Sequence, residues 1–180
     1  RGRKCKDNLS GIDFIYLFPF VKYPRSQIIR TGLTLTSFPD TLIYPFEGVN
    51  LSFTDSQSTE DGGKFFTENL TADFIGLELN TSLQKLVDGD YRVIIKDNNG
   101  KFRLLGAYNG MHSEFNSTTG SSAPEFSGYN ITIEGNERQE ALFIDDLEDA
   151  GFIISPENYL ALEDGTLILT EDNQFIIVEE

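Results

Sequence analysis

Apolar and polar residues alternate along much of this 180-residue chain with the period of two that is typical of half-buried β-strands. In residues 49–56, for example, Val49, Leu51 and Phe53 fall on one face and polar side chains fall on the other. Residues 11–21 are apolar almost throughout, which predicts a buried strand. Strands are predicted at residues 11–21, 27–37, 41–46, 49–56, 64–74, 91–96, 101–108, 126–135 and 141–144.

Two pairs of these strands are predicted to form hairpins. Asp97-Asn98-Asn99-Gly100 stands between two apolar runs, and Asn-Gly at such a position is a strong hairpin signal. The strands at 49–56 and 64–74 are separated by the polar, Gly-rich residues 57–63, which predict a long, mobile tip. A lone hairpin has too little core to be stable, so this pair needs neighbours from the same chain or from another copy.

Three further segments complete the expected architecture. Leu83, Leu86 and Val87 have helical spacing, which predicts one α-helix at residues 80–87, whereas residues 112–126 are rich in Ser, Thr and Gly and predict a loop. Acidic pairs recur every eight residues near the C-terminus, with apolar runs between them. We therefore expect a mainly β, antiparallel fold with one helix, divided into a basic arm at 1–10, a β domain at 11–145 and an acidic β arm at 146–180.

Charge is distributed unevenly along the chain. The formal net charge is −15, yet residues 134–180 carry 14 acids and one base while residues 1–133 carry 15 acids and 13 bases. The first six residues carry four bases and no acid. This asymmetry suits head-to-tail contacts between copies, and two solvated tails are the alternative. The acidic balance argues against a basic nucleic-acid reader and against docking on anionic lipid.

Few residues are suited to catalysis or to metal binding. The chain has one Cys and one His, and His112 lies in a polar run that predicts an ordinary surface residue. P-loop, GxSxG, HExxH and EF-hand patterns are absent from the sequence, and no run approaches 18 apolar residues. We therefore expect no enzyme, no cofactor, no metal site and no membrane-spanning helix. Glycosylation sequons permit a secreted protein, although chance explains them better, at Asn8, Asn50, Asn69, Asn80, Asn116 and Asn130.

The order of these features resembles the tail-tube fold of bacteriophages and contractile injection machines. The likeness covers roughly residues 11–145 and lies in the hairpin at 49–74 with its Asp-Gly-Gly tip, the helix at 80–87, the hairpin at 91–108, and the strand Gly-Tyr-Asn-Ile-Thr-Ile-Glu-Gly at 128–135. The opening Lys4-Cys5-Lys6-Asp7-Asn8 and the Leu-Thr-Glu-Asp run at 169–172 are similar to virion proteins of phages that infect Bacteroidetes, including crAss-like phages.

The resemblance implies a β-sandwich or barrel of tail-tube type whose copies form a ring of six or twelve around a channel. Neighbouring hairpins would join edge to edge, DNA would pass only as cargo, and adjacent tail or portal-side ring proteins would be partners in the virion. The acidic arm favours a neck or tail ring over a repeating tube subunit. Lumen-facing candidates are Asn50, Ser52, Thr54, Thr67 and Asn69; inter-subunit tip candidates are Glu60, Asp61, Gly62, Gly63 and Lys64; inter-ring arm candidates are Leu167, Leu169, Phe175 and Ile177.

Two other classes of function compete with the ring. A secreted carbohydrate-binding or adhesion β-sandwich would be a stable monomer with exposed aromatic residues clustered on one face. An enzyme would need a site assembled from scattered carboxylates and tyrosines. The size of the particle in solution separates the ring from both alternatives.

Overall fold

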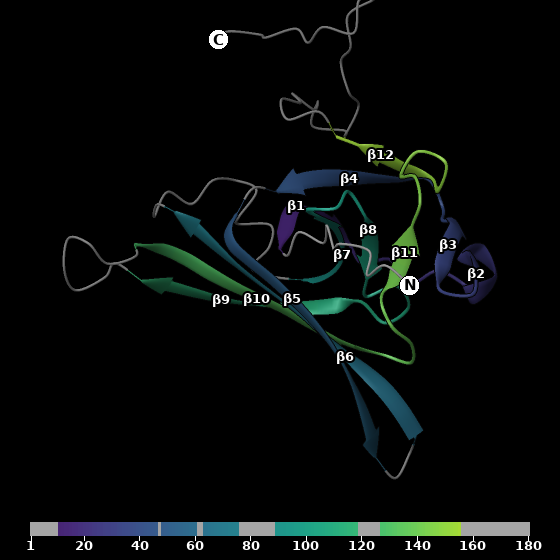
Figure 1. Ribbon diagram of the computed structural model, residues 1–180, viewed down its shortest axis with the longest axis horizontal. Coiled ribbons are helices and arrows are strands. Elements are labelled where there is room, and N and C mark those ends of the chain that lie inside the picture. Colours follow the sequence, from purple (N-terminus) through teal and green to yellow (C-terminus); the bar gives the residue numbers. More distant parts are fainter. Residues whose placement is uncertain (1–10, 47, 61–62, 76–88, 119–126, 156–180) are drawn as a thin grey trace, which may run out of the picture.

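The computed structural model describes residues 11–46, 48–60, 63–75, 89–118 and 127–155. This part of the chain is mainly β, with one short 3-10 turn, η1 (Arg25–Gln27) (Figure 1). The predicted helix at 80–87 and the predicted arm beyond residue 155 lie outside the described residues. The described strands are β1 (Ile12–Pro19), β2 (Ile29–Thr31), β3 (Thr34–Ser37), β4 (Thr41–Phe46), β5 (Val49–Glu60), β6 (Gly63–Ile75), β7 (Asp90–Asp97), β8 (Phe102–Leu105), β9 (Met111–Thr118), β10 (Gly128–Glu137), β11 (Leu142–Ile144) and β12 (Phe152–Ile154).

β7 lies at the centre of the sheet because strands pair with both of its edges. β1 pairs with one edge, and β8 pairs with the other edge over residues 93–96 of β7. At Asp90 and Tyr91 the place of β8 is taken by β9. The sheet therefore divides into two branches, β12-β4-β1-β7-β8-β11-β3-β2 and β9-β10-β6-β5, and it does not close on itself (Figure 1).

The sheet is mixed, which corrects the expectation of a wholly antiparallel fold. β11 pairs in parallel with β3, and β12 pairs in parallel with β4. The two members of each pair are far apart in the sequence, so the chain returns through many other strands before it meets its partner. No tight turn then imposes an antiparallel direction.

Two hydrophobic cores lie on opposite faces of the β1–β7 pair, and this explains why residues 11–21 are apolar almost throughout. Ile15 and Leu17 point into the first core, under β6, β9 and β10, whereas Tyr16 and Phe18 point into the second core, under β3, β4, β11 and β12. A strand that is buried on both faces needs an apolar side chain at every position rather than at alternate positions. The pattern thus predicted the burial of β1 correctly.

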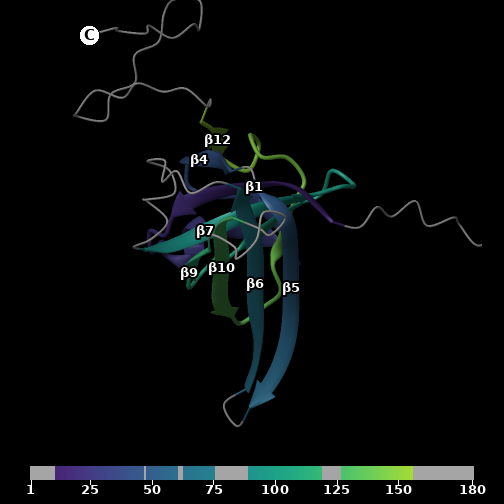
Figure 2. The ribbon, with the colours of Figure 1, turned by 90° about the vertical axis from the view of Figure 1, so that its left-hand side faces the viewer.

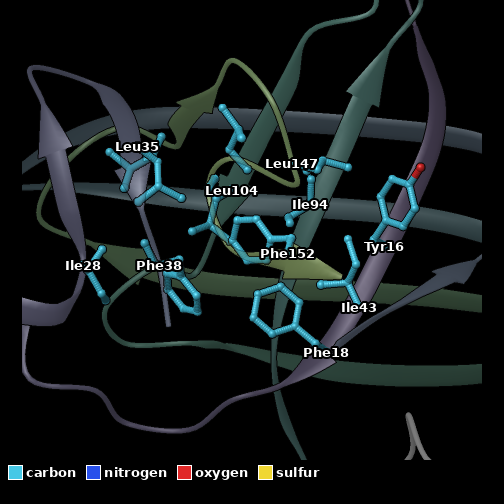
Figure 3. Close-up of a cluster of buried hydrophobic side chains, with 14 residues drawn as sticks. Tyr16, Phe18, Ile28, Leu35, Phe38, Ile43, Ile94, Leu104, Leu147 and Phe152 are labelled. Atoms are coloured by element: carbon cyan, nitrogen blue, oxygen red, sulfur yellow. The ribbon is translucent and has the colours of Figure 1, made fainter. Parts of the chain in front are cut away.

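Stacked aromatic rings fill the middle of the second core (Figure 3). The rings of Phe38 and Phe152 lie nearly parallel with their centroids 5.1 Å apart. Phe18 meets the edge of Phe38 at 6.1 Å. Offset-stacked and edge-to-face pairs of this kind stabilise a core by about 0.5–1.5 kcal/mol beyond the area that they bury. Phe152 belongs to β12, so residues 146–155 are packed onto the body through this cluster.

The hairpin predicted around residues 97–100 is confirmed as β7–β8. The backbone N–H of Asp97 donates to the carbonyl of Lys101 at 2.9 Å, and Gly100 has a φ of +74°. The Asp97 carboxylate accepts the backbone N–H groups of Asn99 and Lys101, both at 2.9 Å. A glycine in the left-handed region is what a three-residue hairpin loop requires.

Three predicted boundaries were wrong. Residues 27–37 form two strands, β2 and β3, because Gly32 adopts a φ of +64° and reverses the chain between them. Residues 111–118 form β9 rather than a loop; Met111 and Phe115 point inward while His112 and Glu114 point outward, so the Ser- and Thr-rich composition hid a half-buried strand. The strands β5 and β6 also continue to Glu60 and from Gly63, which leaves little of the predicted loop at 57–63.

The two cores are expected to contribute to stability independently. Ile131 lies in the first core and Ile43 in the second, and both side chains are fully buried. We expect Ile131→Val and Ile43→Val each to lower the free energy of unfolding by about 0.5–1.5 kcal/mol. Their effects should add to within about 0.5 kcal/mol in the double variant, because β1 and β7 separate the cores. Urea denaturation measures both quantities, with the exposed Thr36→Ser as the control; strong coupling would mean that the cores pack as one unit.

Candidate functional site

The second branch of the sheet places four strands side by side in the order β9, β10, β6 and β5 (Figure 2). β10 pairs with β6 from Gly128↔Ile75 to Glu137↔Phe66. The long hairpin β5–β6 is therefore paired with β10. Along most of its length, the neighbouring strand that a lone hairpin needs for stability comes from the same chain. Three ladder positions at its end, from Ser58↔Phe65 to Glu60↔Gly63, extend past β10.

One face of these four strands carries polar side chains, and we call it the polar sheet face. The register puts Thr54, Asn69, Glu134 and His112 in one row across all four strands. The opposite face carries Leu70, Ile131 and Ile133, which belong to the first core. The members of the polar sheet face are Asn50, Ser52, Thr54 and Ser56 of β5; Thr67, Asn69, Thr71 and Asp73 of β6; Asn130, Thr132, Glu134 and Asn136 of β10; and His112, Glu114 and Asn116 of β9.

The structure brings the five lumen-facing candidates together on this face. Asn50, Ser52 and Thr54 come from β5, and Thr67 and Asn69 come from β6. Asn50 lies at a bulge near the start of β5, with a φ of +53°, and its side chain still reaches this face. That these residues line a channel stays a prediction.

Hydrogen bonds between side chains connect the polar sheet face across its strands. Asp73 accepts from Asn50 at 2.9 Å and from Asn130 at 2.6 Å, which joins β5, β6 and β10. The hydroxyl groups of Ser52 and Thr71 are 2.7 Å apart. Two further bonds join β6 to β10, from Thr67 to Asn136 at 2.8 Å and from Asn69 to Glu134 at 3.1 Å. Such cross-strand pairs fix the side chains and the register.

The charge of this face is negative. Its carboxylates belong to Asp73, Glu114 and Glu134, and none of its members is a Lys or an Arg. His112 is exposed, as the sequence predicted, and its Nδ1 lies 3.5 Å from the Asp90 carboxylate. The face thus presents amides, hydroxyls and carboxylates to whatever lies in front of it.

The same four strands end in two long open edges. Among the described residues, β5 pairs only with β6, and residues 114–118 of β9 pair only with β10. Neither strand contains Lys or Pro, two residues that proteins commonly place on edge strands to prevent pairing with other chains. The terminal strands of the other branch, β2 and β12, have three residues each and offer much shorter edges. Long edges without Lys or Pro are suited to pairing with another chain.

The predicted contact residues at the hairpin tip are only partly described. Gly63 pairs with Glu60 at the end of the ladder, and Lys64 is exposed opposite Thr59. Asp61 and Gly62 lie outside the described residues, as do the arm candidates Leu167, Leu169, Phe175 and Ile177.

Buried ionisable groups hold the turn that directs β9 into this branch. We call residues Gly106–Gly110, between β8 and β9, the β8–β9 junction. The Glu68 carboxylate accepts the N–H of Gly106 at 2.7 Å, and the Glu137 carboxylate accepts the N–H groups of Tyr108 and Asn109, both at 2.7 Å. The carbonyl of Ala107 accepts from Nε of Arg92 at 3.1 Å. Buried backbone groups need such partners when no ladder supplies them.

Arg92 is fully buried and is surrounded by aromatic rings. Its guanidinium lies 4.4 Å from the centroid of Phe20 and 5.2 Å from that of Phe38, and it donates to the Val21 carbonyl at 2.9 Å. Burial lowers the pKa of Arg92 to about 10, so the side chain remains charged at neutral pH. Cation–π contacts and carbonyl acceptors thus replace part of the water that the cation has lost, while Nη1 has no hydrogen-bond partner in the described part of the chain.

Glu68 is the least expected member of this group. It is buried, and burial raises its pKa to about 8, with the negative charges of Glu137 and Asp55 acting in the same direction. Asp55 is its direct cross-strand neighbour, and Oδ1 of Asp55 has no hydrogen-bond partner in the described part of the chain. Glu68 has the same strand parity as the apolar Phe66 and Leu70, which was the signal in the sequence that it points inward.

Several findings bear on the class of site. Within the described ranges, no three His, Cys, Asp or Glu side chains are grouped to hold a metal ion. None of the helices in those ranges is both long and apolar enough to span a bilayer. No protein-family model, curated protein or solved structure matches this chain.

Glu68 is expected to make stability depend on pH in the unusual direction. Since its folded-state pKa of about 8 is above the ordinary value of 4.5, the folded chain binds the proton more tightly than the unfolded chain. The contribution of Glu68 to the free energy of unfolding is fully present below about pH 4.5 and is lost as the pH rises through 8. Burial also raises the pKa of Glu137, which acts in the same sense.

Glu68→Gln should reduce the decrease in the free energy of unfolding between pH 5 and 9. The amide resembles the protonated acid and keeps an oxygen that accepts the N–H of Gly106. Urea denaturation at intervals from pH 5 to 9 measures the effect. Glu134→Gln, on the exposed face of the neighbouring strand, is the matched control and should keep the parent slope. An unchanged slope in Glu68→Gln would show that Glu68 is ionised in the folded chain.

Proposed function

We propose that this chain is a structural virion protein that forms a homo-oligomeric ring of tail-tube type in the neck or tail of a bacteriophage. In this proposal the ring lines the channel through which the genome passes, and DNA is cargo rather than a ligand. The observation that carries the proposal is the four-stranded sheet with a polar, anionic face and two long open edges.

The directions of the strands favour pairing between neighbouring copies. β5, β6, β10 and β9 are each antiparallel to the next, so β9 runs opposite to β5. If the β5 edge of one copy pairs with the β9 edge of the next, the alternation continues without interruption. Such a contact joins two different surfaces, and contacts of that kind form rings when the rotation closes. Closure removes every open edge of this branch at once.

The position of the first core favours the polar sheet face as the lining. The apolar face of the four strands is covered by β1 and β7 of the same copy, so the bodies of the subunits would surround the barrel. Six copies would supply about 24 strands, and a spacing of ~4.8 Å gives a circumference of about 115 Å and a diameter of roughly 37 Å. A ring of that width can surround a DNA duplex closely, whereas twelve copies would give a channel about twice as wide.

The electrostatics of the polar sheet face suit the passage of DNA. A duplex carries one negative charge per about 1.7 Å of its axis, and a lining rich in Lys and Arg would hold it by many contacts. The members of the face are neutral or acidic, with Asp73, Glu114 and Glu134 as its carboxylates. Repulsion within the Debye length of about 8 Å would keep the duplex from adhering.

The first test is the size and shape of the purified protein. We expect light scattering and negative-stain electron microscopy to find rings with a central hole; a stable 20.2 kDa monomer at high concentration would contradict the proposal and favour an adhesion or carbohydrate-binding domain.

Ser56→Pro and Gln57→Pro form a matched pair, because successive residues of an antiparallel strand direct their N–H groups to opposite sides. One of the two should fold as a monomer without assembling, and assembly of both would exclude the β5 edge from the interface.

A second test concerns the lining. Replacing Thr54 and Asn69 by Lys should convert a ring that does not retain duplex DNA into one that binds it, with an affinity that falls steeply as salt increases. The matched control is Thr36→Lys together with Thr31→Lys, on exposed positions of the other branch. Filter binding or fluorescence anisotropy measures the affinity. Equal binding by the two variants would show that the polar sheet face does not surround the channel.

A further inference from the structure

Three arginines surround one cleft in this otherwise acidic chain. The cleft has a volume of about 430 Å³ and is formed by η1, β2 and the residues that follow β10. Arg25, Arg30 and Arg138 line it, and all three are exposed. The one carboxylate in the lining, Glu137, is turned inward to the N–H groups of the β8–β9 junction. The cleft therefore offers cationic groups with little local compensation.

The contacts that the three arginines make within the chain leave most of their N–H donors available to bind an anionic group. Arg25 lies over the ring of Tyr108, 5.4 Å from its centroid, and Arg30 donates through Nη1 to the carbonyl of Gly32. Within the described part of the chain, none of the three forms an ion pair. A guanidinium carries five N–H donors in a planar fork that fits a carboxylate, so most of this capacity is unused. Gln139 also lines the cleft, and its Nε2 is a buried donor without a hydrogen-bond partner.

We propose that this cleft binds the acidic C-terminal segment, residues 156–180, of a neighbouring copy, an inference that rests on the proposed ring. The segment carries seven acids and no base, and two of its acidic pairs, Glu163-Asp164 and Glu171-Asp172, stand at the predicted turns of the arm. Turns present adjacent carboxylates, which is the arrangement that a group of arginines recognises best. In this proposal the acidic segment of one subunit binds at a defined site, the arginine cleft of the next subunit.

The acidic segment fits the cleft better than nucleic-acid phosphates do. Glu137 lies on the opposite face of β10 from the polar sheet face, so the cleft opens away from the surface that is proposed to meet DNA. Every subunit also brings its own acidic segment into the assembly, and attachment raises the effective concentration to the millimolar range.

A neighbouring copy supplies the segment more readily than the same copy. Figure 1 shows that the chain leaves β12 at the end that lies away from β2. The described chain of one copy therefore ends away from its own cleft, which favours a neighbouring subunit as the source of the segment. An exchange of this kind joins each subunit to the next by a second contact, separate from the β5 and β9 edges.

Mixed disulfide cross-linking of the full chain tests the proposal. One variant carries Cys5→Ser and Ser26→Cys at the cleft, and the other carries Cys5→Ser and Thr170→Cys between the acidic pairs. Because each chain then has a single cysteine, a cross-link that forms only in the mixture joins two copies. We expect a covalent dimer in the mixture after mild oxidation, and its yield should decrease as salt increases.

Charge reversal identifies the cleft as the receptor. Arg30→Glu with Arg138→Glu in the cleft chain should lower the yield several-fold, whereas Lys22→Glu with Lys101→Glu, an equal change of charge outside the lining, should leave it unchanged. Equal yields in the two reversed chains would overturn the proposal. A cross-link that forms only when both cysteines are in one chain would also overturn the proposal, because the segment would then bind its own cleft. Absence of the cross-link, together with DNA binding that depends on the three arginines, would overturn it in favour of nucleic acid.

Electron microscopy of the same samples separates the two proposals. Intact rings without the cross-link would refute the receptor for the arm and leave the ring standing. Cross-linked dimers without rings would refute the ring.

Discussion

The β8–β9 junction is the constraint on which the architecture depends. At this turn the chain leaves the centre of one branch and enters the other, so several backbone N–H and C=O groups are buried without a ladder partner. Glu68 and Glu137 reach it from β6 and β10, and Arg92 reaches it from β7. Backbone also approaches backbone very closely, because a Cβ on Gly135 would lie 2.7 Å from the carbonyl oxygen of Gly110. The bonds that complete this turn therefore also tie the three strands together.

This arrangement explains why an acidic hairpin can carry a buried carboxylate. An ionised Glu68 opposite Asp55 would place two negative charges on neighbouring strands of a buried face, which destabilises a sheet. Protonation of Glu68 removes that repulsion and still leaves an oxygen for the N–H of Gly106. With its raised pKa, Glu68 can bond the junction from the middle of the hairpin without a charge, and side-chain hydrogen bonds connect the strands on the opposite, polar sheet face.

The sequence predicted the parts of the fold whose signal is local. Alternation identified β5 and β10, the continuous apolar run identified β1, and Asn-Gly identified the β7–β8 hairpin, since each depends on a few adjacent residues. Parallel pairing of β11 with β3 was missed because it is decided by contacts distant in sequence. Of the site, the placement of five polar residues on one face followed from strand parity. The arginine cleft did not, because Arg25 and Arg138 are brought together only by the tertiary fold.

In the proposed ring, the distribution of charge over the folded chain follows from the contacts that each surface would have to avoid. A lining that carried Lys or Arg would retain DNA, and an edge that carried Lys would not pair with its neighbour; β5 and β9 contain neither Lys nor Arg. Of the three cleft arginines, Arg25 and Arg138 lie outside the strands, and Arg30 lies on β2, a short terminal strand of the other branch. Within the described part of the chain the three arginines around the cleft form no ion pair, and in the proposed ring the anionic group that each subunit would meet is the acidic segment of its neighbour.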